Sequence, residues 1–264
     1  MISIFVPPGK IQITNIIPMN MSSPTLDISL SLADLVRKNF QYASILEKYR
    51  IDFCCGGEKS LAEACRAKGL NPEEILNALT LAGPPFQGDL PDFENSELDF
   101  LADYIVKTHH QYVSKNLPIL HDLGLKIVNV HGPNHPEVIE ILPLFEAIRE
   151  ELTHHMMKEE VILFPSIIEM VQNQRDGLPL QPPPFGSIAN PIRMMEAEHT
   201  SAGGNFEKIY QLSQGYTPPS DACASFRLFY EKLKEFEQDL HQHIHLENNI
   251  LFPKAIQMEK KMLA

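Results

Sequence analysis

A segment of eleven residues that begins with histidine occurs twice in this 264-residue chain, at residues 155–165 and again at residues 243–253. Six of the eleven aligned positions are identical, and a glutamate follows the first histidine by four residues in both copies. On a helix this spacing places the imidazole and the carboxylate on one face, one turn apart. Histidine and glutamate brought together in this way are typical metal ligands. The chain therefore carries the same candidate metal-binding pattern twice.

Each copy has a further histidine upstream, His110 before the first and His199 before the second. The sequence thus predicts two repeats, each a helix with one histidine followed by a helix with His-x-x-x-Glu. Apolar residues spaced alternately by three and four place these candidates on faces that should point into a bundle core. The same spacing continues to Ile162, which we expect to be buried. The candidate ligands are His110, His155, Glu159, His199, His243 and Glu247.

Six polar groups that point into an apolar interior are costly unless they are neutralised, hydrogen-bonded or bound to metal. A pair of divalent ions would bind all six groups and so offset the cost of burying them. Taken singly, each histidine could be an ordinary core residue and each glutamate a solvated helix charge, but six groups in register and in duplicate favour metal. Four imidazoles and two carboxylates suit iron or manganese, and zinc also accepts them.

The two carboxylates are the natural candidates to be shared between the ions, because carboxylates on facing helices can bridge two metals in a bundle. Six protein ligands shared by two ions leave coordination positions open for oxygen, nitric oxide or solvent. We expect Glu159 and Glu247 to bridge, with His110 and His155 on one side and His199 and His243 on the other.

Two adjacent cysteines, Cys54 and Cys55, stand on a glycine-rich turn ahead of a helix predicted to start near Ser60. A helix N-terminus favours thiolates, so we predict redox or metal-transfer thiols here. In the alternative interpretation, Cys54 packs as a small apolar residue and Cys55 has no role. The other two cysteines, Cys65 and Cys223, are expected to be packing residues.

The chain is predicted to be all-α, with four consecutive parts. These are a disordered tail at 1–28, a small helical domain with the Cys-Cys motif at 29–82, a linker at 83–95 and a four-helix bundle at 96–264.

Capping and stop signals locate the helices of the small domain. In the bundle, a proline follows each glutamate ligand by six residues and is expected to kink or end its helix. The predicted helices of the small domain run from Ser31 through Arg50, from Ser60 to Gly69, and from Asn71 to near Gly83.

Composition narrows the class of protein. The chain has 22 basic and 34 acidic residues and a net charge of −12, which argues against a nucleic-acid partner and against an anionic membrane surface. No window approaches the roughly 18 apolar residues that span a bilayer, and the N-terminus lacks the pattern of a signal peptide. Four scattered cysteines do not form a secreted disulfide framework, so we expect a reducing cytoplasm.

The motifs together resemble the repair-of-iron-centres family of di-iron proteins, from about residue 29 to residue 253. The resemblance is carried by Ile-Asp-Phe-Cys-Cys-Gly-Gly at 51–57, Ser-Leu-x-Glu-Ala-Cys at 60–65, Glu-x-Glu-His at 196–199 and the two repeats at 155–165 and 243–253. It implies a haemerythrin-like four-helix bundle with a bridged pair of non-haem iron ions, and a bacterial cytoplasmic protein that repairs iron-sulfur clusters damaged by nitric oxide or oxidants.

Carried over residue by residue, the resemblance implies that the six candidate ligands hold the iron and that Cys54 and Cys55 are the catalytic redox pair. One departure is Arg50, which stands where the family usually has glycine. A second open point is His109, which lies beside His110 and could replace it as ligand.

Three functions are compatible with this pattern. In the first, the protein repairs damaged iron-sulfur proteins through redox cycling or iron donation at the di-iron centre, assisted by the thiols. In the second, it is an enzyme that reduces nitric oxide or consumes peroxide. In the third, it is a non-catalytic sensor that binds O2 or NO. The Cys-Cys motif argues against the third function, because a sensor that only binds a small ligand does not need it. A homodimer is a possible assembly.

Overall fold

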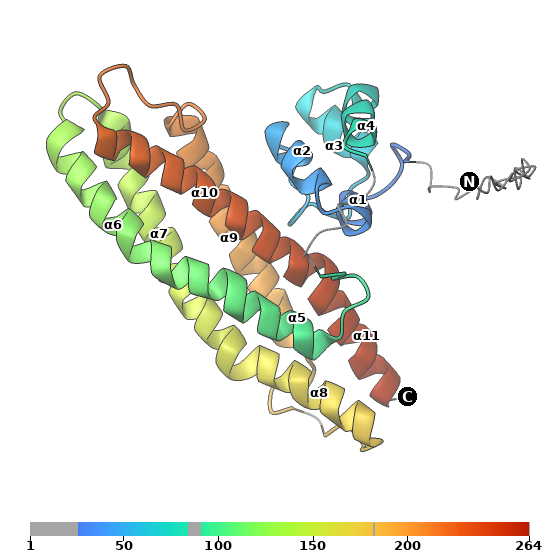
Figure 1. The fold of residues 1–264 in the computed structure, drawn as a ribbon. Helices are drawn as coiled ribbons and strands as arrows, with labels where there is room; N and C mark the ends of the chain where they lie inside the picture. The colour runs from blue at the N-terminus through green and yellow to red at the C-terminus, as the bar shows by residue number, and fades with distance from the viewer. Residues whose placement is uncertain (1–25, 84–90, 182, 264) are drawn as a thin grey trace, which may run out of the picture.

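The computed structural model describes residues 26–83, 91–181 and 183–263, and the regular structure within these ranges is helical throughout. The predicted all-α fold is therefore confirmed. The expected disordered tail lies outside the described residues except for its last three positions, and so does most of the expected linker. Figure 1 shows a small group of short helices beside the middle of a long helical bundle.

The small domain is built from short helices whose ends follow local sequence signals. The Ser60 hydroxyl and the Glu63 carboxylate form a capping box at the start of α3, and Gly69 ends this helix with φ 67°. Asn71 caps α4, with Pro72 in its first turn. The helices are α1 (Leu32–Lys38), α2 (Tyr42–Lys48), α3 (Leu61–Lys68) and α4 (Pro72–Leu81).

The prediction of one helix from Ser31 through Arg50 is wrong, because the chain turns at Asn39. This residue has extended backbone angles, φ −154° and ψ 106°. Its side chain accepts a hydrogen bond from the backbone N–H of Gln41 at 3.1 Å and donates one to the carbonyl of Gly83 at 3.3 Å. An asparagine side chain can compete in this way with the helical hydrogen bonds of the backbone.

Four rods form the bundle, and three of them contain a π-helical turn. α5 (Leu98–Ile105), η1 (Val106–His110) and α6 (Gln111–His131) form one continuous rod in Figure 1. The other rods are α7 (Pro136–Lys158) with η2 (Glu159–Leu163) and α8 (Phe164–Asp176), then α9 (Ala189–Leu212), and finally α10 (Ala224–Leu246) with η3 (Glu247–Leu251) and α11 (Phe252–Leu263).

The π turns explain why Pro165 and Pro253 do not end their helices. Proline lacks the N–H that an α-helical bond needs, and the wider π turn immediately before it relieves the resulting mismatch. A π turn also inserts one residue into the helical register. For that reason Ile162, predicted to be buried, is 46% exposed, and Leu163 takes the inward position at 1% exposure.

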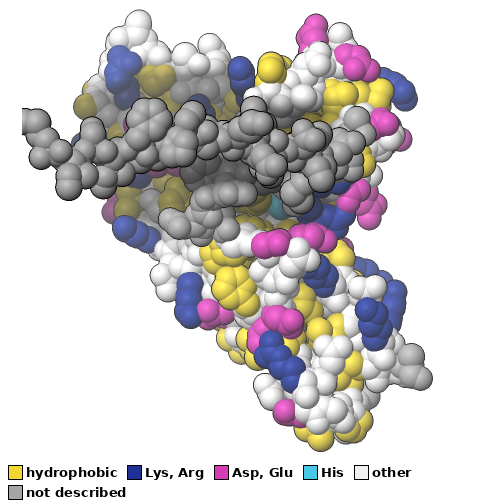
Figure 2. Space-filling view, turned by 45° about the vertical axis from the view of Figure 1, so that its right-hand side comes forward, with side chains coloured by type: hydrophobic (Ala, Val, Ile, Leu, Met, Phe, Trp, Pro, Cys, Tyr) yellow, Lys and Arg dark blue, Asp and Glu magenta, His cyan; other side chains and the backbone are white. Residues whose placement is uncertain are grey.

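The candidate ligands lie between two buried apolar clusters. Around His199 on α9, Met195 belongs to one cluster and Ala202 to the other; around His243 on α10, Leu246 and Leu240 are divided in the same way. Figure 2 shows acidic and basic side chains interspersed over the face that it presents, with little histidine in view. Among the described helices, none combines the length and apolarity needed to cross a membrane.

Arg50 joins the small domain to the bundle. Its guanidinium donates to Glu207 on α9 at 2.7 Å and to Glu237 on α10 at 2.8 Å, and it lies 3.8 Å from the ring centroid of Tyr210. Its backbone has φ 54°, a conformation that glycine adopts more easily. The unusual residue therefore keeps the geometry of the turn, and its side chain gains contacts that glycine would lack.

We predict that Arg50→Gly destabilises the protein. Relief of the positive φ gains about 1 kcal/mol, but the substitution leaves the buried Glu237 carboxylate without its cation, which costs roughly 3 kcal/mol. Denaturant unfolding should show a net loss of about 2 kcal/mol. Adding Glu237→Gln should recover most of it, and an unchanged or higher stability for Arg50→Gly alone would contradict this account.

Candidate metal centre

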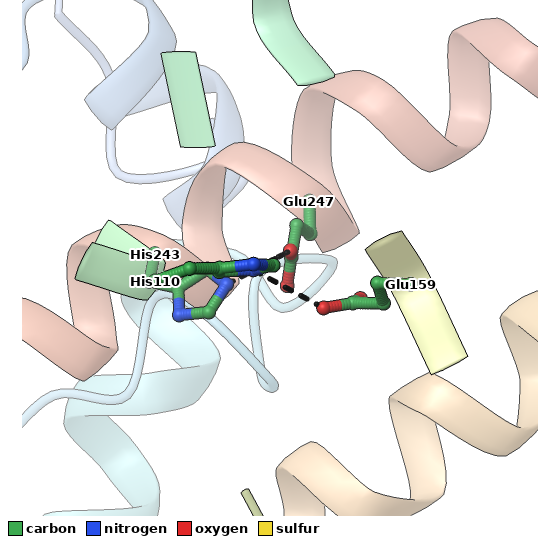
Figure 3. A group of neighbouring side chains, drawn as sticks. All are labelled: His110, Glu159, His243 and Glu247. Carbon is green, nitrogen blue, oxygen red and sulfur yellow. Dashed lines mark hydrogen bonds and ion pairs between the residues drawn. The ribbon is translucent and has the colours of Figure 1, made fainter. Parts of the chain in front are cut away.

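The six predicted ligand residues converge at one place in the bundle, although they come from all four rods. Each is at most 2% exposed. They form two overlapping groups whose ligand atoms lie within 4.8 Å of one another, and Glu159 and Glu247 belong to both groups. Figure 3 shows one group, with both carboxylates directed toward the two imidazoles. This sharing is the arrangement that bridging carboxylates require.

The structure pairs the histidines differently from our expectation. His110 lies with His243, and His155 lies with His199. The rods that carry each pair are neighbours, since α6 packs against α10 and α7 packs against α9, although α6 also packs against α7. The first helix of each repeat therefore meets the second helix of the other repeat, so each group draws its histidines from both repeats.

Short distances join the ligand atoms in each group. His243 Nε2 lies 2.9 Å from Glu247 Oε1, and His199 Nε2 lies 3.1 Å from Glu247 Oε2. On the other carboxylate, Glu159 Oε2 lies 3.2 Å from His155 Nε2 and 3.4 Å from His110 Nε2. Each carboxylate thus lies close to both histidines of its own repeat.

Three of the histidines have Nδ1 fixed by an outward partner. His110 Nδ1 lies 2.8 Å from Glu160, His155 Nδ1 lies 2.8 Å from Glu198, and His199 Nδ1 lies 2.9 Å from the Asn248 amide oxygen. Because each partner atom is an acceptor, each Nδ1 carries the proton and each Nε2 presents a lone pair to the centre. These three partners were not predicted from the sequence, although each adjoins a predicted ligand.

The residues fit a metal because their inward atoms lack other partners. Two Nε2 atoms, of His155 and His199, face each other at 3.0 Å, which is unfavourable for two lone pairs unless a proton or a cation is present. His110 Nε2 and both oxygens of Glu159 are buried without a hydrogen-bond partner. Orphaned buried polar atoms of this kind are costly, and cations at the centre would satisfy them.

The pKa shifts of the buried groups also indicate that the centre requires positive charge. Burial disfavours the imidazolium of His155, but the Glu159 and Glu247 carboxylates outweigh it and raise the pKa of His155 to about 9. Burial also opposes the charge of Glu247, yet His243 and His199 hold the pKa of that carboxyl well below its usual range. Without metal the site must therefore hold protons, which bound cations would displace.

His109 does not face the centre. Its Nδ1 pairs with Asp239 at 3.0 Å, and its ring stacks on His243 with 5.5 Å between centroids and 8° between planes. Of the two adjacent histidines, the structure therefore directs His110 inward. His109 instead supports the ring of His243 from outside.

The loop that carries the cysteines is fastened to the residues that follow Glu247. Asn249 Nδ2 donates to the carbonyls of Phe53 and Cys54, each at 3.2 Å, and Asn248 Nδ2 donates to the Cys54 carbonyl at 3.4 Å. A Cβ added to Gly57 would lie 2.4 Å from Asn249 Oδ1, so this close approach requires glycine. The Cys-Cys loop and the centre are thus joined through Asn248.

The burial of the cysteines and the pKa of the Cys54 thiol differ from our expectation. Cys54 is buried and Cys55 is exposed. A hydrogen bond with Cys55, burial and the Asp52 carboxylate raise the pKa of the Cys54 thiol, so the predicted thiolate-favouring effect of the helix N-terminus does not prevail there. Cys65 is buried, as predicted for a packing residue, whereas Cys223 is exposed and lies 3.1 Å from His131 Nε2.

Comparison with known proteins first defines the class. The family described as "Hemerythrin HHE cation binding domain" matches residues 101–255, and a "Domain of Unknown function (DUF542)" matches residues 28–82. The bundle is therefore a hemerythrin-type cation-binding domain, preceded by a second family domain that holds the Cys-Cys loop.

Named relatives define the family more closely. The chain is 38% identical over 213 residues to the "Probable iron-sulfur cluster repair protein" of Haemophilus influenzae, covering 80% of this chain and 90% of the relative. It is 36% identical to "Iron-sulfur cluster repair protein YtfE" of Yersinia pseudotuberculosis (83% and 93% covered) and 31% identical to "Iron-sulfur cluster repair protein ScdA" of Staphylococcus haemolyticus (80% and 91%). The chain belongs to this repair-of-iron-centres family.

We predict that Glu159→Gln reduces metal binding at both groups, because Glu159 belongs to both. Loss of the shared charge should lower the bound metal to less than half of the wild-type content, with affinity reduced at least about tenfold. Elemental analysis after dialysis checks this, with Glu169→Gln on the exposed face of α8 as the matched control. Full metal content in Glu159→Gln would exclude a shared ligand.

We also predict that Asn248→Leu lowers both the metal affinity of the centre and the protection of the Cys54 thiol. His199 loses its Nδ1 acceptor, so metal affinity should fall roughly 10-fold to 100-fold, and Cys54, less firmly covered, should be alkylated faster in a Cys55→Ser background. Glu160→Gln is the matched control, since Glu160 supports His110 without touching the loop. If Glu160→Gln exposed Cys54 equally, Asn248 would have no special role.

Proposed function

We propose that this protein repairs iron-sulfur clusters damaged by nitrosative or oxidative stress, through redox cycling or iron donation at a bridged di-iron centre assisted by Cys54 and Cys55. The observation that carries the proposal is the attachment of the thiol loop to Asn248 and Asn249, directly after the bridging Glu247. The relatives named as iron-sulfur cluster repair proteins align with this chain over at least 90% of their own length.

The chain would hold the iron through Nε2 of four histidines and the carboxylates of Glu159 and Glu247. Glu160, Glu198 and Asn248 fix three of the rings by accepting from Nδ1–H, so little reorganisation is needed when ions bind. Bound iron would supply one-electron redox steps that amino-acid side chains cannot. The apolar clusters on both sides exclude bulk water from the centre.

The thiols complete the proposed function on the side of the client protein. Cys55 is exposed and can contact a client protein. Cys54 is buried, and its backbone carbonyl accepts a hydrogen bond from Asn248. The pair could supply electrons to the centre or hold iron during its passage. A sensor that only binds O2 or NO would need neither the exposed thiol nor its attachment to the bundle.

The test is repair of a purified [4Fe–4S] enzyme that nitric oxide has inactivated. Iron-loaded protein, added without oxygen, should restore its activity; Glu247→Gln should fail, and Glu169→Gln should match the wild type. No restoration, in an assay where an established repair system succeeds, would refute the proposal. Consumption of nitric oxide or peroxide without repair would support the enzyme alternative instead.

A further inference from the structure

A second group of potential metal ligands lies outside the bundle centre. One carboxylate oxygen of Asp52 and the sulfur atoms of Cys54 and Cys55 all lie within 4.8 Å of one another. Asp52 Oδ1 lies 3.2 Å from Cys54 Sγ. Two sulfurs and one carboxylate oxygen at such separations can surround a single ion, and thiolates select thiophilic metals over magnesium or calcium.

The backbone holds this group in a fixed geometry. Asp52 Oδ1 accepts hydrogen bonds from the N–H groups of Cys54 at 3.1 Å and Cys55 at 2.9 Å. Gly56 allows the turn to close, since a Cβ there would lie 2.8 Å from the Asp52 carbonyl oxygen and 3.3 Å from its Oδ2. The anchoring of the Cys54 carbonyl by Asn249 fixes the other side of the loop. The three ligands are therefore positioned before any ion arrives.

The surroundings favour a cation. The group lines a cleft of about 410 Å³ between the loop, α9 and α10. Four carboxylates line it against two basic side chains, and one of these, Arg50, is already paired with Glu207 and Glu237. Gly203 and Gly204 of α9 also line the cleft. A Cβ added to either glycine would meet nothing within 4 Å, so no other group fills the space beside them.

We propose that Asp52, Cys54 and Cys55 form a second metal site, for a thiophilic divalent cation such as Fe²⁺. Binding is an exchange without change of oxidation state: the ion forms two metal–sulfur bonds, and the two thiol protons pass to solvent. With three protein ligands, of which Asp52 and Cys55 are exposed, the site holds its ion loosely. This inference rests on the proposed function and deepens it, since such a site suits iron in transit between the bundle and a damaged cluster.

Co²⁺ tests the site directly in the full-length, iron-loaded, reduced protein. Thiolate ligation gives cobalt an intense near-ultraviolet charge-transfer band, whereas the His and Glu ligands of the bundle give none. We expect the band to saturate at one Co²⁺ per chain and to disappear on brief treatment with a chelator that leaves the bundle iron in place. Absence of the band in the wild type would overturn the proposal.

Variants assign the band to particular residues. Cys55→Ser should abolish it, and because Cys55 is exposed the fold should be retained. Asp52→Asn keeps an oxygen that can accept from the two backbone N–H groups, so the turn should persist while Co²⁺ affinity falls at least about tenfold. Cys223→Ser should leave the band unchanged. If Cys223→Ser removes the band, or Cys55→Ser retains it, the site is not the one proposed.

The bundle and the cluster-repair assay provide separate readouts. Iron content of the bundle should be the same in Cys55→Ser and the wild type, because Cys55 is not among its ligands. A cobalt band without cluster repair would sink the proposed function and leave the second site standing. Cluster repair by the wild-type protein, with no cobalt band, would overturn the second site and leave the proposed function standing.

Discussion

The burial of two carboxylates close together is the constraint on which the rest of this structure depends. Glu159 and Glu247 lie at 0% exposure, and each raises the cost of ionising the other. Carboxylates in such a position are stable only with positive charge between or beside them. The four inward histidines, the outward hydrogen-bond acceptors of three of them and the hemerythrin-type cation-binding class are all consistent with this one requirement.

The π turns are the means by which an ordinary four-rod bundle meets that constraint. His110 ends η1, Glu159 begins η2 and Glu247 begins η3, so three of the candidate ligands lie at π turns. A π turn widens the helix locally and shifts its register by one residue, which lets a ligand point inward without ending the rod. Single π turns within α-helices are frequent at functional sites for this reason.

Much of the fold and the candidate site could be predicted from the sequence. Residues at regular three-and-four spacing on α9 were predicted correctly, because that rod has no π turn. Ile162 was mispredicted because a π turn leaves no simple periodic signal. The pairing of histidines and the role of Asn248 depend on which rods are neighbours, which the order of the repeats does not determine. One of the two hydrogen bonds of the Asn39 side chain joins it to Gly83, which is distant in sequence, so the local pattern does not reveal this contact.

The two repeats have diverged where the small domain meets the bundle. After the glutamate of the repeated segment, the first copy continues with Glu160 and Val161, of which Val161 is exposed. The second copy continues with Asn248 and Asn249, which hold the Cys-Cys loop. The halves of the bundle are therefore no longer interchangeable. The first repeat contributes to the centre, whereas the second repeat contributes to the centre and also binds the Cys-Cys loop of the small domain. The duplicated bundle is therefore asymmetric in its contacts.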